Sequence, residues 1–469
     1  MNRPFLRALA ASSLLLAATP GAVAAHTLGE QYQAPLPLIA YVLGAALAVA
    51  MSFAFVMLRE PAQGDEPPHA EPREVPAWLR NVLRLAGVVA WLWIVAQAIA
   101  GGSGQADVAS LFLWVYGWVG VALISALLGP IWSWLDPFST IHMGLTWLGR
   151  RLGLSSGEGE ARPYPAGLGK WPAVLGFCFF IWLELVARVE GGRTLGVVVI
   201  GYSLITLAGM FYFGRETWRR QAEVFSVWFG LLGRLAPWEL VSRPEDSFVR
   251  RRPFAHGLAG GWSPAELVLV GLGAGSIIFD GLSQTELYFD LFRQTGFGLP
   301  AVLIDSLTGA GFLLLVLALV LSVSRRLGTA ALGAGLLPVA VGYLIAHYLV
   351  FLLVDGQRIV NALNDPLQRG DNLLPFDLGF HEPVLFLPTA IIWTIQLAAV
   401  VGGHVLGAWA GHAALARSGR AVRPLAQLPL AALMVLLTSV TLWSLGQAVI
   451  AEPEAGRLLT RLAALLWAG

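Results

Sequence analysis

The sequence has few charges and one cysteine, and it lacks several common catalytic motifs of soluble enzymes. Asp, Glu, Lys and Arg make up only 13% of its 469 residues, about half of their share in soluble domains. The 30 basic residues balance 29 acidic ones without forming a basic block, so nothing supports binding to nucleic acid. With Cys178 alone, the chain cannot form an intramolecular disulfide or a thiolate-based metal cluster. Walker A, H-E-x-x-H and C-x-x-C motifs are absent.

Apolar residues dominate instead. They make up 57% of the chain, and the mean hydropathy is +0.69. We therefore predict an all-α fold, a polytopic membrane helix bundle that forms one domain over residues 26–469. The bundle is expected to have about ten transmembrane helices, each long enough to cross a bilayer. The predicted spans cover residues 38–58, 79–100, 108–129, 171–188, 194–213, 264–283, 300–323, 332–354, 384–408 and 427–450.

Residues 1–25 have the three parts of a secretory signal peptide. Arg3 and Arg7 precede a short apolar stretch, and small residues follow up to the end of the segment. The apolar stretch is too short for a transmembrane helix of about 20 residues, which is the alternative interpretation. Cleavage is expected after Ala24 or Ala25, and the second cut would make His26 the N-terminus. A free amine beside an imidazole is a chelating pair.

Basic residues indicate the orientation of the bundle. The odd-numbered connections and adjoining helix starts hold 21 Lys and Arg residues, whereas the even-numbered connections and the C-terminal segment hold seven. Because basic residues stay in the cytoplasm during insertion, we expect the mature N-terminus and the C-terminus outside. Two odd-numbered connections, at about 136–152 and 216–235, have apolar residues at helical spacing and Arg nearby. This pattern predicts helices that lie in the lipid headgroup layer. Both segments contain Phe-Ser and a later Leu-Gly-Arg, which hints at a duplication.

Ionisable side chains inside a span are costly and are therefore candidates for function. Asp280 and His347 are both expected in the outer halves of their helices, where His347 can reach Asp280. Their partners there are His26, His381 and Asp355, with Gln357 just beyond, whereas Glu184 lies in another span. Counting about 1.5 Å per residue, His404 lies near the inner surface, too deep to share a metal with His347.

Imidazole and carboxylate ligands suit zinc, manganese or iron, and such a metal lowers the pKa of bound water to about 7. The candidate ligands are His26, Asp280, His347 and His381. The alternative is structural: a membrane histidine that bonds a neighbouring helix, and aspartates that cap helices. His404 and His412 are also eight residues apart, but Gly403, Gly407 and Gly411 recur there at every fourth position, which favours close helix packing.

Several segments resemble bacterial membrane proteins labelled fenitrothion hydrolase. The resemblance runs through nearly the whole mature chain and rests on Ala25-His26-Thr-Leu-Gly, Pro35-Leu-Pro37, Phe225-Ser-Val-Trp-Phe-Gly-Leu-Leu-Gly-Arg234, Ser276-Ile-Ile-Phe-Asp-Gly281, His347 through Gln357, and Gln396 through His412. It implies a shared fold, the bacterial inner membrane and cleavage of a lipophilic organophosphorus triester. This sequence differs from the family at Asp355, where the family has a neutral residue, and that weakens Asp355 as a ligand.

Three functions remain open on the sequence. The first is a membrane-embedded, metal-assisted triester hydrolase with Asp280 and His347 as ligands or base. The second is a proton- or metal-linked transporter that uses Glu184, Asp280, His347 and His404 as a path through the bilayer. The third, a haem- or quinone-linked redox subunit, needs two histidines at matching depth. The expected partners are the lipid bilayer and a lipophilic small molecule.

Overall fold

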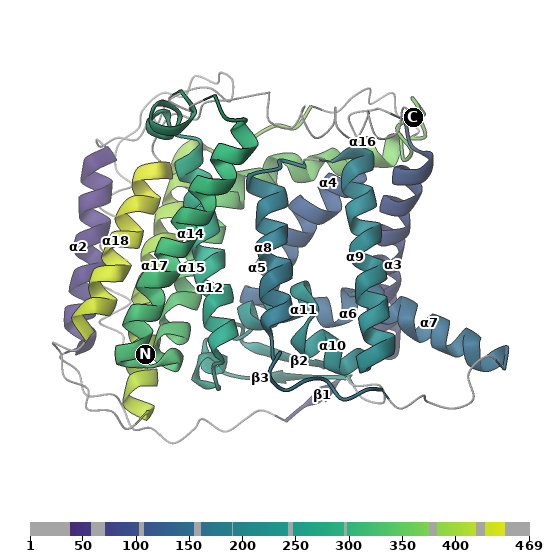
Figure 1. The fold of residues 1–469 in the computed structure, drawn as a ribbon, viewed down its shortest axis with the longest axis horizontal. Helices are drawn as coiled ribbons and strands as arrows, with labels where there is room; N and C mark the ends of the chain where they lie inside the picture. The colour runs from purple at the N-terminus through teal and green to yellow at the C-terminus, as the bar shows by residue number, and fades with distance from the viewer. Residues whose placement is uncertain are drawn as a thin grey trace. The chain divides into compact units, whose positions relative to one another are not determined.

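A computed structural model describes residues 38–57, 71–102, 107–153, 161–189, 191–242, 247–294, 298–374, 382–418 and 427–445. The predicted signal peptide, His26 and His381 lie outside these residues. The described part is mostly helical, as Figure 1 shows. The all-α prediction is therefore confirmed in its main feature.

Each of the ten predicted spans coincides with a helical segment. They are α2 (Leu38–Met57), α3 (Ala77–Ala100), the continuous α4, η1 and α5 (Val108–Ser110, Leu111–Val121 and Ala122–Leu127), α8 (Trp171–Leu185), α9 (Gly192–Phe213), α12 (Pro264–Ser283), α14 (Ala301–Leu327), α15 (Thr329–Asp355), α17 (Thr389–Arg417) and α18 (Leu428–Leu445). Of the helices that the structure describes, eight are long and apolar enough to cross a membrane, and α8 and α18 are shorter. A multi-pass membrane bundle follows, and the number of crossings stays a prediction.

Glycines allow the helices of the bundle to pack closely. An ideal Cβ on Gly407 of α17 would lie 2.3 Å from the carbonyl oxygen of Gly335 on α15. On Gly273 of α12 it would lie 2.4 Å from the ring of Trp228. Neither distance leaves room for a methyl group, so these positions require glycine. The packing function predicted for the glycines around His404 is confirmed, and α12 is the most buried helix of the bundle.

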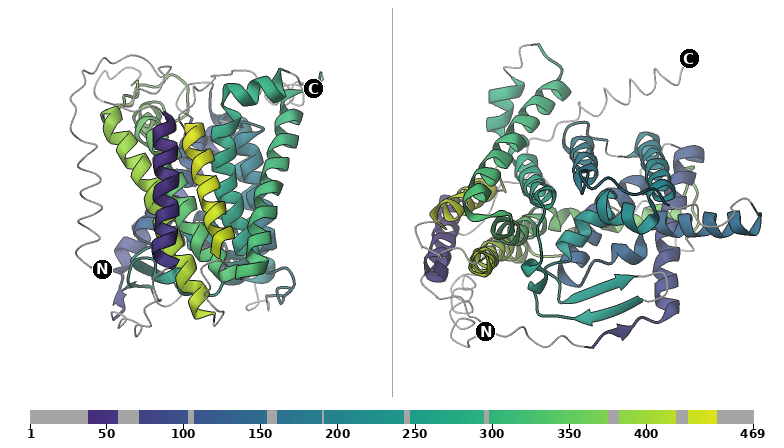
Figure 2. Two further views of the ribbon diagram at one scale, coloured as in Figure 1. Left: turned by 90° about the vertical axis from the view of Figure 1, so that its left-hand side faces the viewer. Right: turned by 60° about the horizontal axis from the view of Figure 1, so that its bottom comes forward.

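One end of the bundle carries short elements and much of the arginine. We call it the basic end, and it holds α6 (Trp132–Leu135), α7 (Pro137–Arg151), α10 (Arg215–Gln221), α11 (Val224–Leu232), η2 (His256–Ala259) and a small sheet. The sheet joins β1 (Arg73–Glu74), β2 (Trp238–Ser242) and β3 (Ser247–Arg251) in the antiparallel order β1-β3-β2 (Figure 2). Val249 is opposite both Arg73 and Leu240 in this sheet. The opposite end holds α13 (Glu286–Tyr288), η3 (Phe289–Arg293), η4 (Gly356–Arg358) and α16 (Ile359–Asn364).

The two predicted amphipathic helices differ in outcome. α7 matches the first, and its Leu145 and Leu148 are 46% and 45% exposed, as a helix in the headgroup layer would be. The second, expected as one helix over 216–235, is divided into α10 and α11 at Ala222. The apolar side of α11, including Trp228, is buried in the protein, so this segment is a packed helix and not a surface one.

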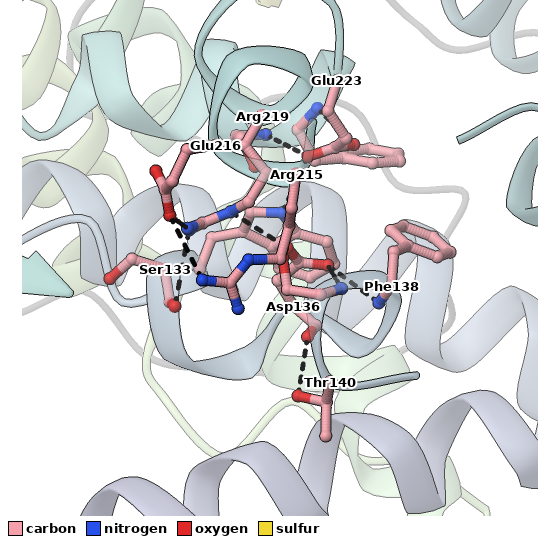
Figure 3. A network of polar contacts seen from close by, with 12 residues as sticks. Ser133, Asp136, Phe138, Thr140, Arg215, Glu216, Arg219 and Glu223 are labelled. Carbon is pink, nitrogen blue, oxygen red and sulfur yellow. Dashed lines mark hydrogen bonds and ion pairs between the residues drawn. The ribbon is translucent and has the colours of Figure 1, made fainter. Parts of the chain in front are cut away.

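Two acidic residues begin helices at the basic end, and Figure 3 shows their network. Asp136 accepts hydrogen bonds from the backbone N–H groups of Phe138 (2.9 Å) and Ser139 (3.2 Å) at the start of α7. Glu223 accepts equivalent bonds from the two residues of the second Phe-Ser motif at the start of α11. The duplicated motif therefore starts both helices in the same way. Arg219 pairs with Asp136 (3.2 Å), while burial and then the nearby Asp136 charge raise the pKa of Glu223.

Glu266 ties together three segments at the basic end. Its carboxylate accepts from Lys170 at the start of α8, from Arg234 after α11 (2.6 Å) and from the backbone N–H of Ser263 (2.7 Å). The Ser263 hydroxyl in turn accepts from the Glu266 N–H, which completes a capping box for α12. The Glu266 side chain is only 4% exposed. This carboxylate sets the relative height at which α8 and α12 begin.

Removing this carboxylate should destabilise the bundle. Glu266→Ala leaves two cations without their partner in a nearly buried place, so we expect the free energy of unfolding to fall by about 3–5 kcal/mol. The measurement is reversible unfolding of the purified protein in detergent. Glu239→Ala is the matched control, because the Glu239–Arg250 pair is about one-third exposed and should contribute less than about 1 kcal/mol. Equal losses in the two variants would contradict the role given to Glu266.

Candidate active site

An imidazole and a carboxylate from two helices meet in the half of the bundle away from the basic end. His347 Nε2 on α15 lies 2.7 Å from Asp280 Oδ2 on α12. Each side chain is 16% exposed, so the pair is shielded and still reachable by a small molecule. The contact that the sequence predicted between these two residues is present.

Three further polar side chains complete the cluster. The hydroxyl of Tyr348 donates to Glu184 Oε1 (3.0 Å) on α8 and lies 3.4 Å from Asp280 Oδ2. Gln284, one turn beyond Asp280, donates from Nε2 to Asp280 Oδ1 (2.8 Å). Both oxygens of the Asp280 carboxylate are therefore hydrogen-bonded, which fixes its orientation. We call Glu184, Asp280, Gln284, His347 and Tyr348 the acid–histidine cluster.

The cluster forms because α8, α12 and α15 run in the same direction from the basic end (Figure 1). With a rise of 1.5 Å per residue, Glu184, Asp280 and His347 lie about 20, 24 and 27 Å from the first residues of their helices. Helices that begin at similar heights therefore bring these side chains to similar depths. The shared Glu266 contact between the starts of α8 and α12 supplies part of this alignment.

Aromatic rings close the cluster toward the basic end. Trp118 lies on the π-helical η1, and its ring meets Tyr348 edge-on at a centroid distance of 6.5 Å. The same indole stacks on Trp228 of α11 (5.9 Å) and packs against Phe180 of α8 (4.9 Å). Trp118 and Trp228 are each 1% exposed. Trp118, Trp228 and Phe180 therefore form an apolar aromatic floor beneath Tyr348, and this floor holds the phenol ring in one orientation.

Gly281 allows α18 to pack closely against α12 beside His347. An ideal Cβ on Gly281 would lie 2.9 Å from Ser444 Oγ and 3.9 Å from His347 Cε1. A side chain at this position would therefore push α18 away from α12 beside the histidine. The glycine that follows Asp280 in the sequence is required by packing.

The other predicted site residues lie elsewhere. His404 is fully buried. Its Nδ1 donates a hydrogen bond to the Val400 carbonyl, and its Nε2 is hydrogen-bonded to the Tyr343 hydroxyl at 3.2 Å. Asp355 pairs with Arg358 (2.8 Å) at the opposite end. Gln357 donates to the Leu353 and Val384 carbonyls. None of these three contacts belongs to the acid–histidine cluster, so they stabilise helix ends and helix packing.

The expected metal site is not formed by the residues that the structure describes, because no three His, Cys, Asp or Glu side chains among them are arranged to hold a metal ion. The two best ligand atoms, His347 Nε2 and Asp280 Oδ2, are bonded to each other. His26 and His381 lie outside the described residues, so their part in a metal site stays a prediction.

The sequence analysis did not predict Tyr348 or Gln284, because it began from Asp, Glu and His residues within or next to the spans. A usable signal existed, since Tyr348 adjoins His347 and Gln284 lies one helical turn after Asp280. Neither residue is charged, however, and polar uncharged residues are common in spans.

The geometry suits proton abstraction. An imidazole whose Nε2–H is held by a carboxylate presents Nδ1 as the base, and the carboxylate stabilises the imidazolium that forms. Among the described residues, none forms a hydrogen bond with His347 Nδ1. Comparisons of the chain with protein-family models, curated proteins and solved structures found no match. Any function must therefore be argued from the acid–histidine cluster itself.

Proposed function

We propose that this chain is a membrane-embedded hydrolase in which His347, oriented by Asp280, is the general base. The observation that supports this most directly is the 2.7 Å contact between His347 Nε2 and Asp280 Oδ2 in a pair that is shielded but accessible. A positioned base of this kind accelerates proton transfer by about 100- to 10,000-fold. Both residues come from packed helices, which hold them more rigidly than loops would.

The proposed substrates are neutral, lipophilic organophosphorus triesters. Such molecules dissolve in the bilayer and can approach a site that lies among transmembrane helices, and the predicted orientation puts this site in the outer half of the membrane. The resemblance to proteins labelled fenitrothion hydrolase supports the same substrate class. Water gives its proton to His347 Nδ1 while its oxygen bonds to phosphorus. The bond from phosphorus to the aryloxy oxygen then breaks, and its electron pair leaves on the aryloxide.

Loss of either member of the pair should abolish most of this activity. We expect His347→Ala and Asp280→Asn each to lower kcat for an aryl dimethyl phosphorothioate by about 100- to 10,000-fold, because the first removes the base and the second its orienting charge. Release of the phenol by purified protein in detergent measures the rate. His142→Ala on α7, at the basic end, is the matched control and should retain full turnover. Full turnover in the His347→Ala variant would remove the proposal.

Metal removal tests whether the pair acts without further ligands. Since His347 Nε2 and Asp280 Oδ2 bond each other, we expect turnover to survive dialysis against a strong chelator, and the purified protein to hold less than one metal ion per chain. The metal content is measured on the same sample as the rate. Turnover that disappears with the metal and returns on its addition would instead indicate that His26 or His381 completes a metal site.

A proton-linked transporter is the second candidate, and a specific set of contacts favours it. Tyr343 lies one turn before His347 on α15, toward the basic end, where it bonds His404. Further in the same direction, His412 bonds Gln427 (3.0 Å). Buried protonatable groups at successive depths are typical of proton paths in membrane proteins.

Proteoliposomes separate the two candidates. If the chain conducts protons, an imposed pH gradient should decay faster through wild-type protein than through His404→Gln, because glutamine keeps a polar side chain but cannot carry a proton. A pH-sensitive dye inside the vesicles measures the decay, and His142→Gln is the control. Equal decay with wild-type protein and with protein-free vesicles would exclude this second candidate.

A further inference from the structure

Arg80, near the start of α3, lies on the side of that helix that packs against the basic end. It is seven residues before Gly87 and therefore on the same face of α3. An ideal Cβ on Gly87 would overlap the Leu135 carbonyl oxygen, so this face meets the end of α6. The Arg80 Nε atom is buried, and no hydrogen-bond partner for it exists among the described residues. Protein thus partly encloses this side chain without neutralising its charge.

Arg84 lies one turn further along α3 and faces α9. It is seven residues before Trp91, whose indole donates to the Ser203 hydroxyl (2.8 Å) on α9. The two helices are antiparallel, since Ala98 near the end of α3 meets Gly196 near the start of α9. Continuing this register by two turns puts Arg84 level with the last turn of α9, directly before α10 begins. Arg84 therefore lies at the same junction of short helices as the face that meets α6.

The acids at this junction already have partners, as Figure 3 shows for most of them. Asp136 pairs with Arg219 (3.2 Å), and Glu216 accepts from the same guanidinium (3.0 Å). Glu223 accepts from Trp132 Nε1 (3.1 Å) and from the first backbone N–H groups of α11. These carboxylates are committed to α7, α10 and α11, so they are not counter-ions for α3.

The two arginines of α3 are therefore left without a protein anion. Within the part of the chain that the structure describes, neither Arg80 nor Arg84 forms a hydrogen bond or an ion pair, and both are half-buried. Like charges one helical turn apart repel each other, and burial reduces the screening of this repulsion by water. An anion from outside the protein would relieve it, provided that its oxygens can accept from guanidinium donors.

This junction lies at the depth of lipid headgroups. Trp78, two residues before Arg80, is 68% exposed, as aromatic residues at a membrane surface are. The neighbouring α7, which contacts α3, exposes Trp147 and Leu148, and the Arg151 guanidinium lies over the Trp147 ring (5.6 Å). The predicted orientation puts this end at the cytoplasmic leaflet, where anionic lipids attract basic residues. The anions at this depth are the phosphates of lipid headgroups.

We propose that Arg80 and Arg84 bind the phosphate of an anionic phospholipid beside α7. A phosphodiester accepts paired hydrogen bonds from guanidinium groups. The acyl chains of the same lipid can lie along the outward side of α3, where Val82, Leu85 and Val89 are exposed. The lipid would thereby hold α3 and α7 together at the membrane surface. This site is separate from the acid–histidine cluster and does not depend on the hydrolase function.

Lipid binding to the purified protein in a neutral detergent tests the proposal. Native mass spectrometry measures the dissociation constants of phosphatidylglycerol and phosphatidylcholine, which share a phosphate but differ in net charge. We expect wild-type protein to bind phosphatidylglycerol at least about tenfold more tightly, and Arg80→Gln/Arg84→Gln to lose this preference, as loss of charged hydrogen bonds predicts. Arg325→Gln/Arg326→Gln, which removes two exposed charges from the last turn of α14, is the matched control and should keep the preference.

Three results would overturn the inference. The first is equal binding of the two lipids to wild-type protein, or an unchanged preference in Arg80→Gln/Arg84→Gln. The second is a lower unfolding temperature of this variant in lipid-free detergent, since removal of two repelling charges should leave the temperature unchanged or raise it. The third concerns the source of the phosphate. Excess inorganic phosphate should leave phosphatidylglycerol bound, whereas displacement of the lipid would indicate a site for free phosphate.

Discussion

The meeting of Glu184 and Asp280 in the acid–histidine cluster requires α8 and α12 to start at matching heights, and that constraint is set about 20 to 24 Å away at the basic end. Glu266 binds Lys170 before α8 and Arg234 after α11 while it caps α12. Because helices are stiff, alignment at their starts is carried to the level of the acid–histidine cluster. A buried ion pair adds little net stability compared with apolar packing, but it specifies one register among several.

Buried acids in this bundle are neutralised in two different ways. Asp136, Glu266 and Asp305 each pair with Arg or Lys, and such pairs are structural because a permanent cation holds the acid ionised. Asp280 is instead bonded to the imidazole of His347, a group whose ring nitrogens can donate or accept a proton. Among the described residues, the hydrogen-bond partner of Glu184 is the phenol of Tyr348. The imidazole partner distinguishes the acid–histidine cluster from the acids that pair with Arg or Lys and indicates chemistry there.

The sequence was sufficient for features that depend on composition and depth. Apolar runs located all ten of the long helical segments, and counting residues from helix ends predicted that His347 can reach Asp280. The prediction from sequence was wrong for a segment in which polar and apolar residues alternate. The segment 216–235 reads as one amphipathic helix, yet Glu223 breaks it and caps α11. The small sheet was not predicted, because β1 has only two residues and the strands are rich in Arg and Glu.

The aromatic floor bears on the choice between hydrolysis and transport. Trp118, Trp228 and Phe180 fill the space between Tyr348 and the helix starts of the basic end. A proton or an ion would have to cross this apolar layer without polar partners, which is unfavourable in a medium of low polarity. A path through the bundle must therefore bypass it along α15 and α18, where Tyr343 lies. An enzyme needs no such path, because substrate, water and products can all use the same side of the site.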